Sequence, residues 1–399
     1  MNRVIRPLRD FLKRESASGV LILLAAIAGL LIANSPISTN YFKVLDFEFN
    51  ILPSSFSVEL TVLKSINYVL MTIFFFVVGL EIKRELSSGH LSTMKSALTP
   101  VIAALGGMVL PAVIYLVIAA DVDANGWAVP VATDIALAVG LLALAGGSVV
   151  PSLRSFLLAL AVIDDIGAIL IIAFVYSIGI DFMWSSAAVI VVFLLYLLRK
   201  VGFKNTYLYI LVGIALWYCL YKTGIHPTLT GVILGLMTPN ILKENSTLKD
   251  GEDGQVSIIE WLEEKIHPWS SFVIVPLFAF GNTGVEISNN SISSALKSPI
   301  AWGIFAGLVV GKPLGILLTV VIAKKIEFAQ YPIGSKKLDL FATGSAAGIG
   351  FTVAIFIANL AFKDPLIQDI AVISIIMASI ASALISLLLF KALLQKSKN

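Results

Sequence analysis

The sequence predicts an all-α polytopic membrane protein, and three observations lead to this prediction. Of its 399 residues, 58% are hydrophobic and only 13% are charged, which is about half the charged fraction of a soluble domain. The hydrophobic residues form blocks long enough to cross a bilayer of about 30 Å. Two adjacent carboxylates, Asp164 and Asp165, lie in the middle of one such block, 156–175.

The apolar blocks predict about twelve transmembrane helices. The predicted segments are 17–34, 61–83, 97–119, 126–146, 153–177, 183–200, 206–222, 225–238, 257–281, 300–323, 338–361 and 366–394. The longest polar stretch, about 240–257, is too short for a water-soluble domain. We therefore expect one transmembrane domain over residues 1–399. The single cysteine, Cys219, lies in an apolar run and is expected to be a packing residue.

The distribution of Lys and Arg predicts the orientation of the chain. Five basic residues precede the first apolar segment: Arg3, Arg6, Arg9, Lys13 and Arg14. That segment, about 18–33, is longer than the apolar region of a cleaved signal peptide, so a retained helix is favoured over cleavage. With the N-terminus inside, most Lys and Arg residues fall at inward helix ends, which places both termini in the cytoplasm.

The outward loop between the first two helices predicts a small β-hairpin. Residues 46–51 and 55–60 alternate apolar and polar side chains, and Leu-Pro-Ser separates them. An irregular loop is the alternative for the same pattern.

The Asp164–Asp165 pair is the first candidate site. Acidic side chains at membrane depth are costly to insert, so they are rare and mark ion or proton pathways. A chain that places two of them side by side is expected to handle ions or protons with them.

Segment 126–146 predicts an interrupted helix. Pro130 removes a backbone donor, and Asp134 follows four residues later, next to Thr133. A loop at the membrane edge, with Asp134 as a helix cap, is the alternative. However, Ile135–Ala145 is too short to span a bilayer alone, which places Asp134 well inside.

Segment 338–361 predicts a second interruption. Gly344, Gly348 and Gly350 weaken a helix at this depth, although close packing through small residues explains them equally well. Two interrupted segments, one in each half of the chain, point to a transport site between inverted repeats.

Lys312 is an intramembrane cation about a dozen residues from either end of segment 300–323. Such a lysine needs a partner, and the buried carboxylates are available. Snorkelling to the membrane surface is the alternative.

These residues together predict cation–proton exchange. Neighbouring residues on a helix point about 100° apart, so one carboxylate can face Lys312 and the other a cavity. Na⁺ and Li⁺ prefer oxygen ligands, which carboxylates, the Thr133 hydroxyl and unwound carbonyls supply. Burial favours protonated carboxyl groups, so protons compete for the same oxygens. Two carboxylates serving one monovalent ion make an electrogenic exchanger plausible, with no cofactor required.

A charged cluster is expected at the cytoplasmic edge. Its members are Glu81, Lys83, Arg84, Glu85, Glu252, Asp253, Glu260, Glu263, Glu264 and His267. Solvated helix flanks are the simpler interpretation. The alternative is an acidic entry funnel that concentrates cations and senses pH.

Six stretches, in order along nearly the whole chain, resemble the bacterial NhaA-type Na⁺/H⁺ antiporters, a family that itself exemplifies inverted-repeat transporters. The stretches are Phe75–Glu85, Ala132–Ala136, Ala161–Gly167, His267–Trp269, Gly311–Gly315 and Gly348–Thr352.

The resemblance implies twelve helices, with two interrupted helices that cross at mid-membrane. It implies exchange at Asp164 and Asp165, with Asp165 as the principal Na⁺ ligand, Asp164 paired with Lys312 in one protonation state, and Thr133 lining the site. Asp134 would offset the positive helix ends at the crossing and Lys312 the negative ones.

The resemblance also implies alkaline activation through five members of the cytoplasmic cluster, with Glu252 less secure than Glu263: Glu81, Arg84, Glu85, Glu252 and Glu263. It implies a role in sodium and pH homeostasis in the bacterial inner membrane, and a homodimer joined partly through the hairpin 46–60. The expected partners are lipid, a second subunit and small monovalent cations, with no nucleic acid. One residue departs from the family: Tyr68 stands where relatives carry an acid in the second helix.

Other classes fit less well. A sodium-coupled symporter of similar fold would need an anion-binding Arg inside the membrane, but the two arginines in the predicted spans, Arg154 and Arg199, lie only at span ends. A membrane-embedded aspartate-dependent enzyme would need acids on separate helices or an Asp-Asp-x-x-Asp motif, but residue 168 is Ala. For a cation channel, the positive charge of Lys312 is unfavourable.

Overall fold

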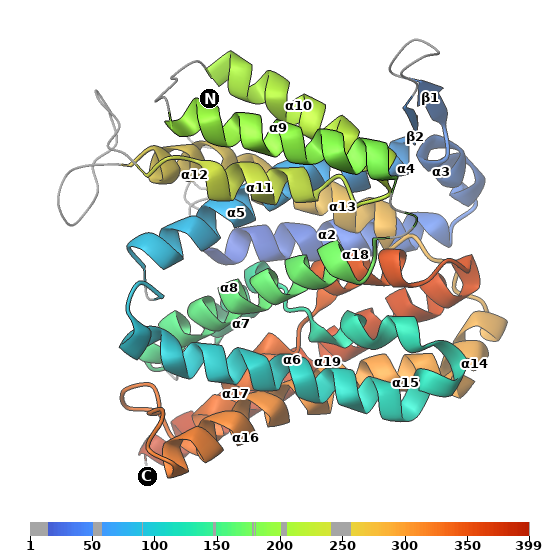
Figure 1. The fold of residues 1–399 in the computed structure, drawn as a ribbon. Coiled ribbons are helices and arrows are strands. Elements are labelled where there is room, and N and C mark those ends of the chain that lie inside the picture. Colours follow the sequence, from blue (N-terminus) through green and yellow to red (C-terminus); the bar gives the residue numbers. More distant parts are fainter. Residues whose placement is uncertain are drawn as a thin grey trace, which may run out of the picture. The chain divides into compact units, whose positions relative to one another are not determined.

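The computed structural model describes residues 15–50, 58–89, 91–146, 149–177, 179, 181–200, 206–240 and 257–398. Nearly all regular structure in these ranges is helical, as Figure 1 shows. The one sheet in the described part of the chain has two antiparallel strands. The predicted class, an all-α membrane protein with a small β-hairpin, is confirmed.

The chain divides into two compact units, each built from separate stretches of sequence. The first comprises Met1–Tyr41, His90–Ala168 and Ala279–Asn399, and the second comprises Phe42–Gly89 and Ile169–Phe278. The first unit contains α2 (Glu15–Ala33), α6 (Met94–Asp123), η3 (Ala124–Val131), α7 (Ile135–Ala145), α14 (Asn289–Lys297), α15 (Pro299–Ala306), η6 (Gly307–Gly311), α16 (Lys312–Lys325), α17 (Lys337–Ala347), α18 (Phe351–Ala361) and α19 (Pro365–Lys398).

The second unit contains β1 (Glu48–Asn50), β2 (Glu59–Thr61), α4 (Val62–Ser65), η2 (Ile66–Leu70), α5 (Met71–Ser87), α9 (Phe182–Lys200), α10 (Thr206–Thr223), α11 (Leu229–Met237), α12 (Ile258–Trp269) and η5 (Ser270–Ile274). Three helices have residues in both units: α3 (Ser38–Leu45), α8 (Pro151–Phe174) and α13 (Val275–Asn282).

Six helical stretches among the described residues are long and apolar enough to cross a membrane, and the number rises to eight if each of two bent pairs is one span. Several predicted segments consist of shorter pieces, such as α12, η5 and α13 over segment 257–281. The count of twelve stays a prediction.

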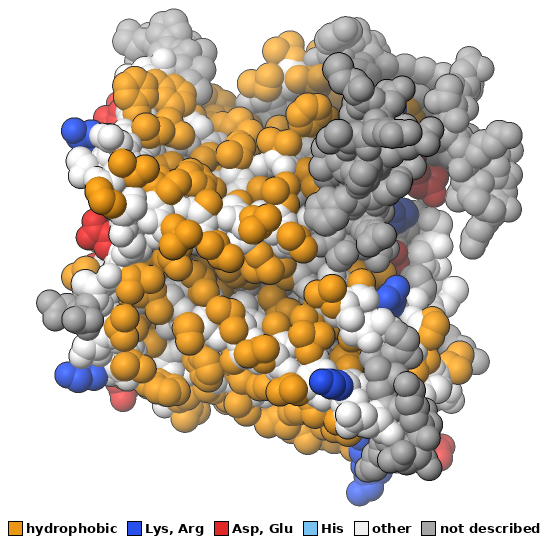
Figure 2. Space-filling view, turned by 180° about the vertical axis from the view of Figure 1, so that it is seen from behind, with side chains coloured by type: hydrophobic (Ala, Val, Ile, Leu, Met, Phe, Trp, Pro, Cys, Tyr) orange, Lys and Arg blue, Asp and Glu red, His pale blue; other side chains and the backbone are white. Residues whose placement is uncertain are grey.

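Apolar side chains remain exposed along these helices, and hydrophobic groups cover much of the face in Figure 2. On α9, Val189, Ile190 and Phe193 are all more than half exposed. A soluble protein would bury such contiguous surface, whereas a lipid bilayer covers it without further partners.

The predicted hairpin is present, with shorter strands than the sequence pattern suggested. Strand β1 pairs with β2 so that Phe49 lies opposite Leu60. Leu60 is buried and the flanking Glu59 is exposed, as expected from alternation. The turn, 51–57, lies outside the described residues.

The first predicted interruption is confirmed, with one correction. Residues 126–131 were expected to be α-helical, but they belong to the 3₁₀ turn η3. Pro130 has no N–H to donate to the carbonyl four residues earlier, so an α-helical ladder cannot continue past this position. Residues 132–134 are then non-helical, and α7 begins at Ile135.

The second predicted interruption is also confirmed. Helices α17 and α18 are separated by 348–350, and their axes bend by 53°. The glycines there also serve close packing: a Cβ on Gly344 would lie 2.9 Å from Pro313 Cα. The glycines of this segment therefore both accompany a helix interruption and allow close packing.

Two widened π-helical turns each end two residues before a proline. Turn η5 is followed by Val275 and Pro276, and η6 by Lys312 and Pro313. Proline cannot donate to the carbonyl four residues earlier, and its ring crowds that carbonyl. The preceding turn widens in response, so the N–H of Lys312 bonds to Gly307 O, five residues back. Pro313 thereby helps to position Lys312.

A stripe of glycines brings the span formed by α15, η6 and α16 close to α6 and η3. Gly303, Gly307, Gly311 and Gly315 recur every four residues along α15, η6 and α16. A Cβ on Gly307 would meet Pro130 at 2.6 Å, and one on Gly311 would meet Pro111 at 2.9 Å. A Cβ on Gly315 would overlap the carbonyl oxygen of Gly106. Small residues allow backbones to approach closely in membranes.

We predict that Gly315→Ala destabilises the protein. The added methyl group collides with α6 backbone, which has no flexible side chain to move aside, and overpacking of this kind costs about 1–3 kcal/mol. The measurement is the thermal unfolding midpoint of the purified protein in detergent. Leu318→Ala, on the exposed face of the same helix, is the matched control. An unchanged midpoint in Gly315→Ala would contradict the close contact.

Candidate ion-exchange site

The candidate site lies in the first unit, where α8 passes the two interrupted segments. Asp164 and Asp165 are both buried on α8, with 1% and 8% of their surfaces exposed. Their helix is continuous from Pro151 to Phe174, so the backbone holds the two carboxylates in adjacent, differently directed positions.

Asp164 pairs with Lys312, as the family resemblance implied. Lys312 Nζ lies 2.7 Å from Asp164 Oδ2, and both side chains are fully buried. The same ammonium group donates a hydrogen bond to Val131 O, at the end of η3. The snorkelling alternative for Lys312 is therefore wrong. Its charge is held by a carboxylate and by the negative end of a short helical turn.

Thr133 lies in the same contact. Its Oγ1 is 2.8 Å from Asp164 Oδ2 and 3.0 Å from Ala347 O, at the end of α17. One hydroxyl proton serves one acceptor at a time, so Thr133 has a choice between a carboxylate and a helix-end carbonyl. Asp164 Oδ1 is buried without a hydrogen-bond partner in the described part of the chain. This oxygen has the chemistry of a proton acceptor or cation ligand.

Asp134 caps two helices at once. Its Oδ1 accepts from the N–H of Leu137, in the first turn of α7. Its Oδ2 accepts from the N–H of Thr352 at 3.1 Å and from the Thr352 hydroxyl at 2.5 Å, at the start of α18. A single carboxylate thus accepts hydrogen bonds from the first turns of both α7 and α18, where the helix dipoles are positive. The cap role considered for Asp134 is confirmed, and the residue is buried in the protein, with 3% of its surface exposed.

The two interruptions meet directly. The N–H of Asp134 donates to Ile349 O at 2.7 Å. Together with the Thr133–Ala347 contact, this joins the non-helical residues of one segment to those of the other. The non-helical backbone at the candidate site is therefore buried in protein, which is the condition under which membrane proteins tolerate it.

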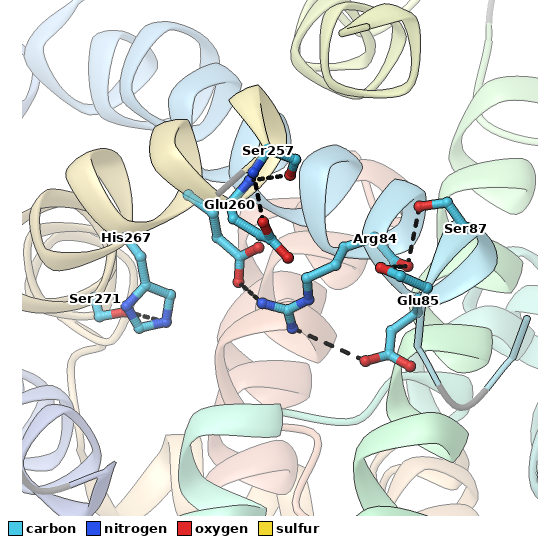
Figure 3. Close-up of polar contacts among 9 residues, drawn as sticks. Arg84, Glu85, Ser87, Ser257, Glu260, His267 and Ser271 are labelled. Carbon is cyan, nitrogen blue, oxygen red and sulfur yellow. Dashed lines mark hydrogen bonds and ion pairs between the residues drawn. The ribbon is translucent and has the colours of Figure 1, made fainter. Parts of the chain in front are cut away.

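The predicted cytoplasmic cluster is partly assembled in the second unit. Arg84 on α5 pairs with Glu263 on α12 at 2.5 Å and approaches Glu85 at 3.9 Å (Figure 3). Glu81 lies one turn earlier on α5. Glu252 lies outside the described residues. The interpretation of Arg84 and Glu263 as merely solvated flanks is wrong, because Glu263 is buried and paired.

Neighbouring groups in this cluster have local structural roles. Glu260 closes a capping box with Ser257 at the start of α12, where Ser257 N donates to Glu260 Oε2 at 2.7 Å. His267 Nε2 lies 3.4 Å from the Ser271 hydroxyl. Figure 3 shows the Arg84 side chain extending from its own helix toward the helix that carries Glu260 and His267.

Tyr68, the departure from the family pattern, packs in an aromatic cluster. It lies in the widened turn η2, with its ring edge-on to His226 at 4.9 Å and to Tyr221 at 6.3 Å. His226 is buried, and its Nδ1 is 2.6 Å from Thr228 Oγ1. A neutral aromatic environment therefore surrounds Tyr68.

Comparison with known proteins agrees with this geometry. The family model described as Na⁺/H⁺ antiporter 1 matches residues 9–390. The chain belongs to this Na⁺/H⁺ antiporter family. A relative named Na⁺/H⁺ antiporter NhaA 1, from Clostridium beijerinckii, is 40% identical over 399 residues, covering 100% of this chain and 98% of its own.

Two further antiporter relatives cover most of the chain. Na⁺/H⁺ antiporter NhaA of Pelagibacter ubique is 44% identical over 361 residues, 90% of each chain. Na⁺/H⁺ antiporter NhaA of Yersinia enterocolitica is 41% identical over 396 residues, 98% of each chain. The family resemblance inferred from the six stretches is thus confirmed, and the protein is a multi-pass membrane transporter rather than an enzyme.

Sequence reasoning missed some members of the candidate site. Thr352 belongs to one of the six family stretches but was not predicted as a site residue, although its hydroxyl binds Asp134. The carbonyls of Val131 and Ala347 were not individually predicted either. A hydroxyl residue two positions after a glycine break was the available signal for Thr352, since Ser and Thr are typical of helix starts.

We predict that Asp134→Ala destabilises the protein more than Asp134→Asn. Alanine removes two caps, at about 0.5–2 kcal/mol each, whereas asparagine retains an acceptor. The measurement is thermal unfolding in detergent. Asp181→Ala is the control, because Asp181 is an exposed residue that accepts from the N–H groups of only one helix, α9. Equal stability of Asp134→Ala and Asp181→Ala would contradict the double cap.

Proposed function

We propose that this protein exchanges Na⁺ or Li⁺ from the cytoplasm for external protons, with Asp164 and Asp165 as the exchange site. The observation that carries the proposal is the buried Lys312–Asp164 pair beside Asp165 at the meeting point of two interrupted helices. Membership of the antiporter family supports it.

The proposed chemistry is competition for oxygen atoms. Asp165 is the principal Na⁺ ligand, helped by Asp164, the Thr133 hydroxyl and helix-end carbonyls such as Ala347 O. A proton bound to the same carboxylate oxygens excludes the cation. Because only one occupant fits at a time, loading with Na⁺ releases protons, which is the minimum requirement for exchange.

Lys312 distinguishes the empty site from the site that holds Na⁺ or a proton, because it pairs with Asp164 only when Asp164 binds neither. While Asp164 is ionised and Na⁺ is absent, Lys312 neutralises it at 2.7 Å. Na⁺ binding to Asp164 displaces the ammonium group, and protonation of Asp164 also dissolves the pair. Two carboxylates that serve one monovalent ion let more than one proton move per cation, so the exchange is electrogenic.

Asp134 and Lys312 also keep the crossing stable without an ion. Asp134 offsets the positive N-termini of α7 and α18. Lys312 offsets the negative end of η3 through Val131 O. In a low-dielectric environment these compensations matter more than they would in water.

The cytoplasmic cluster is proposed to control activity with pH. Glu81, Arg84, Glu85 and Glu263, together with Glu252, would form an acidic funnel that attracts cations. The Arg84–Glu263 ion pair requires an ionised Glu263, so it forms as pH rises. Activation at alkaline pH follows if the paired arrangement is the active one.

The remaining proposals concern assembly and placement. We propose that residues 1–399 work as one transport domain in the bacterial inner membrane, with both termini in the cytoplasm. Two subunits would associate partly through the hairpin of β1 and β2. The physiological role is sodium and pH homeostasis.

We predict that Asp164→Asn and Asp165→Asn each abolish exchange, since an amide neither ionises nor carries a proton across. The measurement uses inside-out vesicles with an acid interior and a fluorescent ΔpH dye, to which NaCl, LiCl or KCl is added. The wild-type protein is expected to dissipate ΔpH with Na⁺ and Li⁺ but not with K⁺.

Asp369→Asn is the control for this experiment, because Asp369 lies on the spanning helix α19 and takes no part in the hydrogen bonds and ion pair described above for the site. It is expected to retain exchange. Wild-type rates in either Asp164→Asn or Asp165→Asn, with the protein inserted, would refute the site.

We predict that Glu263→Gln flattens the activation profile and lowers the activity reached at alkaline pH. Glutamine mimics a protonated carboxyl group permanently, so the charged pair with Arg84 cannot form at any pH. The same dye assay, repeated from mildly acidic to alkaline pH, measures the profile. Glu260→Gln is the control, since glutamine preserves the capping box. Identical profiles for the wild type and Glu263→Gln would exclude this pair from the pH response.

A further inference from the structure

Helix α19 carries four buried serines whose partners differ. Ser374 donates to Ile370 O in its own helix, and Ser386 donates to Ala342 O of α17, each at 2.8 Å. Ser379 and Ser382 lie between them and face the interruption between α17 and α18.

Ser379 supplies a second cap to α18. Its Oγ accepts from the N–H of Phe351, the first residue of that helix, at 3.3 Å. Asp134 accepts from the next N–H, that of Thr352. Gly350, at the N-cap position, has no side chain that could do either. The positive end of α18 is therefore shared between a charged cap on one side and a neutral cap on the other.

Ser382 faces the other side of the same interruption. Its Oγ lies 2.8 Å from the position that a Cβ on Gly348 would occupy, and Leu308 O lies 2.5 Å from that position. Ser382 is 1% exposed, and its hydroxyl has no hydrogen-bond partner among the described residues. Buried hydroxyls of this kind are uncommon in folded proteins.

The carbonyl of Leu308 has lost its usual donors. In η6 the N–H of Lys312 bonds to Gly307 O instead, and Pro313 has no N–H. A buried hydroxyl and a carbonyl deprived of helical donors thus lie on the same side of Gly348, at the end of α17.

We propose that Ser379 and Ser382 are positioning residues for the exchange, an inference that rests on the proposed function. Ser379 holds the start of α18, so that the N–H of Thr352 stays within hydrogen-bond distance of Asp134. Asp134 thereby keeps its position next to Thr133 and the Lys312–Asp164 pair. Ser382 donates its hydroxyl to a backbone carbonyl beside Gly348 when the interruption changes shape during the transport cycle. Helix α19 is thereby part of the transport machinery.

The two serines are expected to have different kinetic signatures. Ser379→Ala leaves a buried N–H unpaired next to Asp134, so the apparent KM for Na⁺ rises about threefold to tenfold, the range expected for one lost hydrogen bond. Ser379→Thr, which keeps the hydroxyl, restores most of the affinity. Ser382→Ala loses a bond made only in another conformation, so the maximal rate falls about threefold to tenfold with KM unchanged.

The assay is Na⁺-driven ΔpH dissipation in inside-out vesicles with the full-length protein at matched expression. Ser386→Ala and Ser374→Ala are the controls, since both are buried serines of α19 that bond away from the interruption. Both are expected to keep wild-type KM and rate. A wild-type KM in Ser379→Ala, a wild-type rate in Ser382→Ala, or equal defects in Ser386→Ala would each overturn the proposal.

Hydrogen exchange of the purified protein provides a readout that does not need transport. Amide exchange in the peptide covering 348–353 is expected to be faster in Ser379→Ala and unchanged in Ser386→Ala, because only the former removes the acceptor of the Phe351 N–H. Unchanged exchange in Ser379→Ala would overturn the cap. A wild-type protein that dissipates no ΔpH, together with faster exchange in Ser379→Ala, would instead overturn the proposed function and leave the cap supported.

Discussion

The structure of the first unit depends on one constraint: helix ends buried in the protein must find partners for their N–H and C=O groups. Water cannot supply them at this depth, so side chains must. Asp134 meets the need of two helix starts, and Lys312 meets that of Val131 O. Lys312 also places a positive charge beside Asp164, and Thr133, the neighbour of Asp134, contacts the same carboxylate. Structural compensation and the candidate ion site are therefore made from one set of groups.

The scaffold around this crossing is shaped by residues with unusual backbone properties. Pro130 ends one helical ladder, and Pro313 widens the turn before it, so that Lys312 enters from a displaced backbone. The glycine stripe allows that backbone to reach α6, since any side chain on Gly315 would collide with Gly106. Proline and glycine thus set the geometry, while the charged residues set the chemistry.

Much of this could be predicted from the sequence. The membrane class follows from composition, the hairpin from alternating side chains, and the two interruptions from Pro130 and Gly348. The rarity of intramembrane charges predicts a carboxylate partner for Lys312, and the family resemblance named Asp164. The 3₁₀ form of 126–131 and the widened turn at Gly307–Gly311 were not predicted, because hydrophobic patterns report which segments are buried and not how many residues make each turn. Glu263 as the partner of Arg84 could not be chosen from several nearby acids.

The sequence by itself determined which residues are out of place in a bilayer: two adjacent aspartates, a third near a proline, and a lysine far from either surface. These follow from local chemistry, since the cost of burying a charge does not depend on the fold. Only the tertiary structure decided which of these residues contact one another. That Asp134 caps both α7 and α18, that Thr352 binds it, and that Ser379 faces Phe351 depend on contacts between residues far apart in the chain. Such pairings are set by how helices pack, and no local pattern encodes that packing.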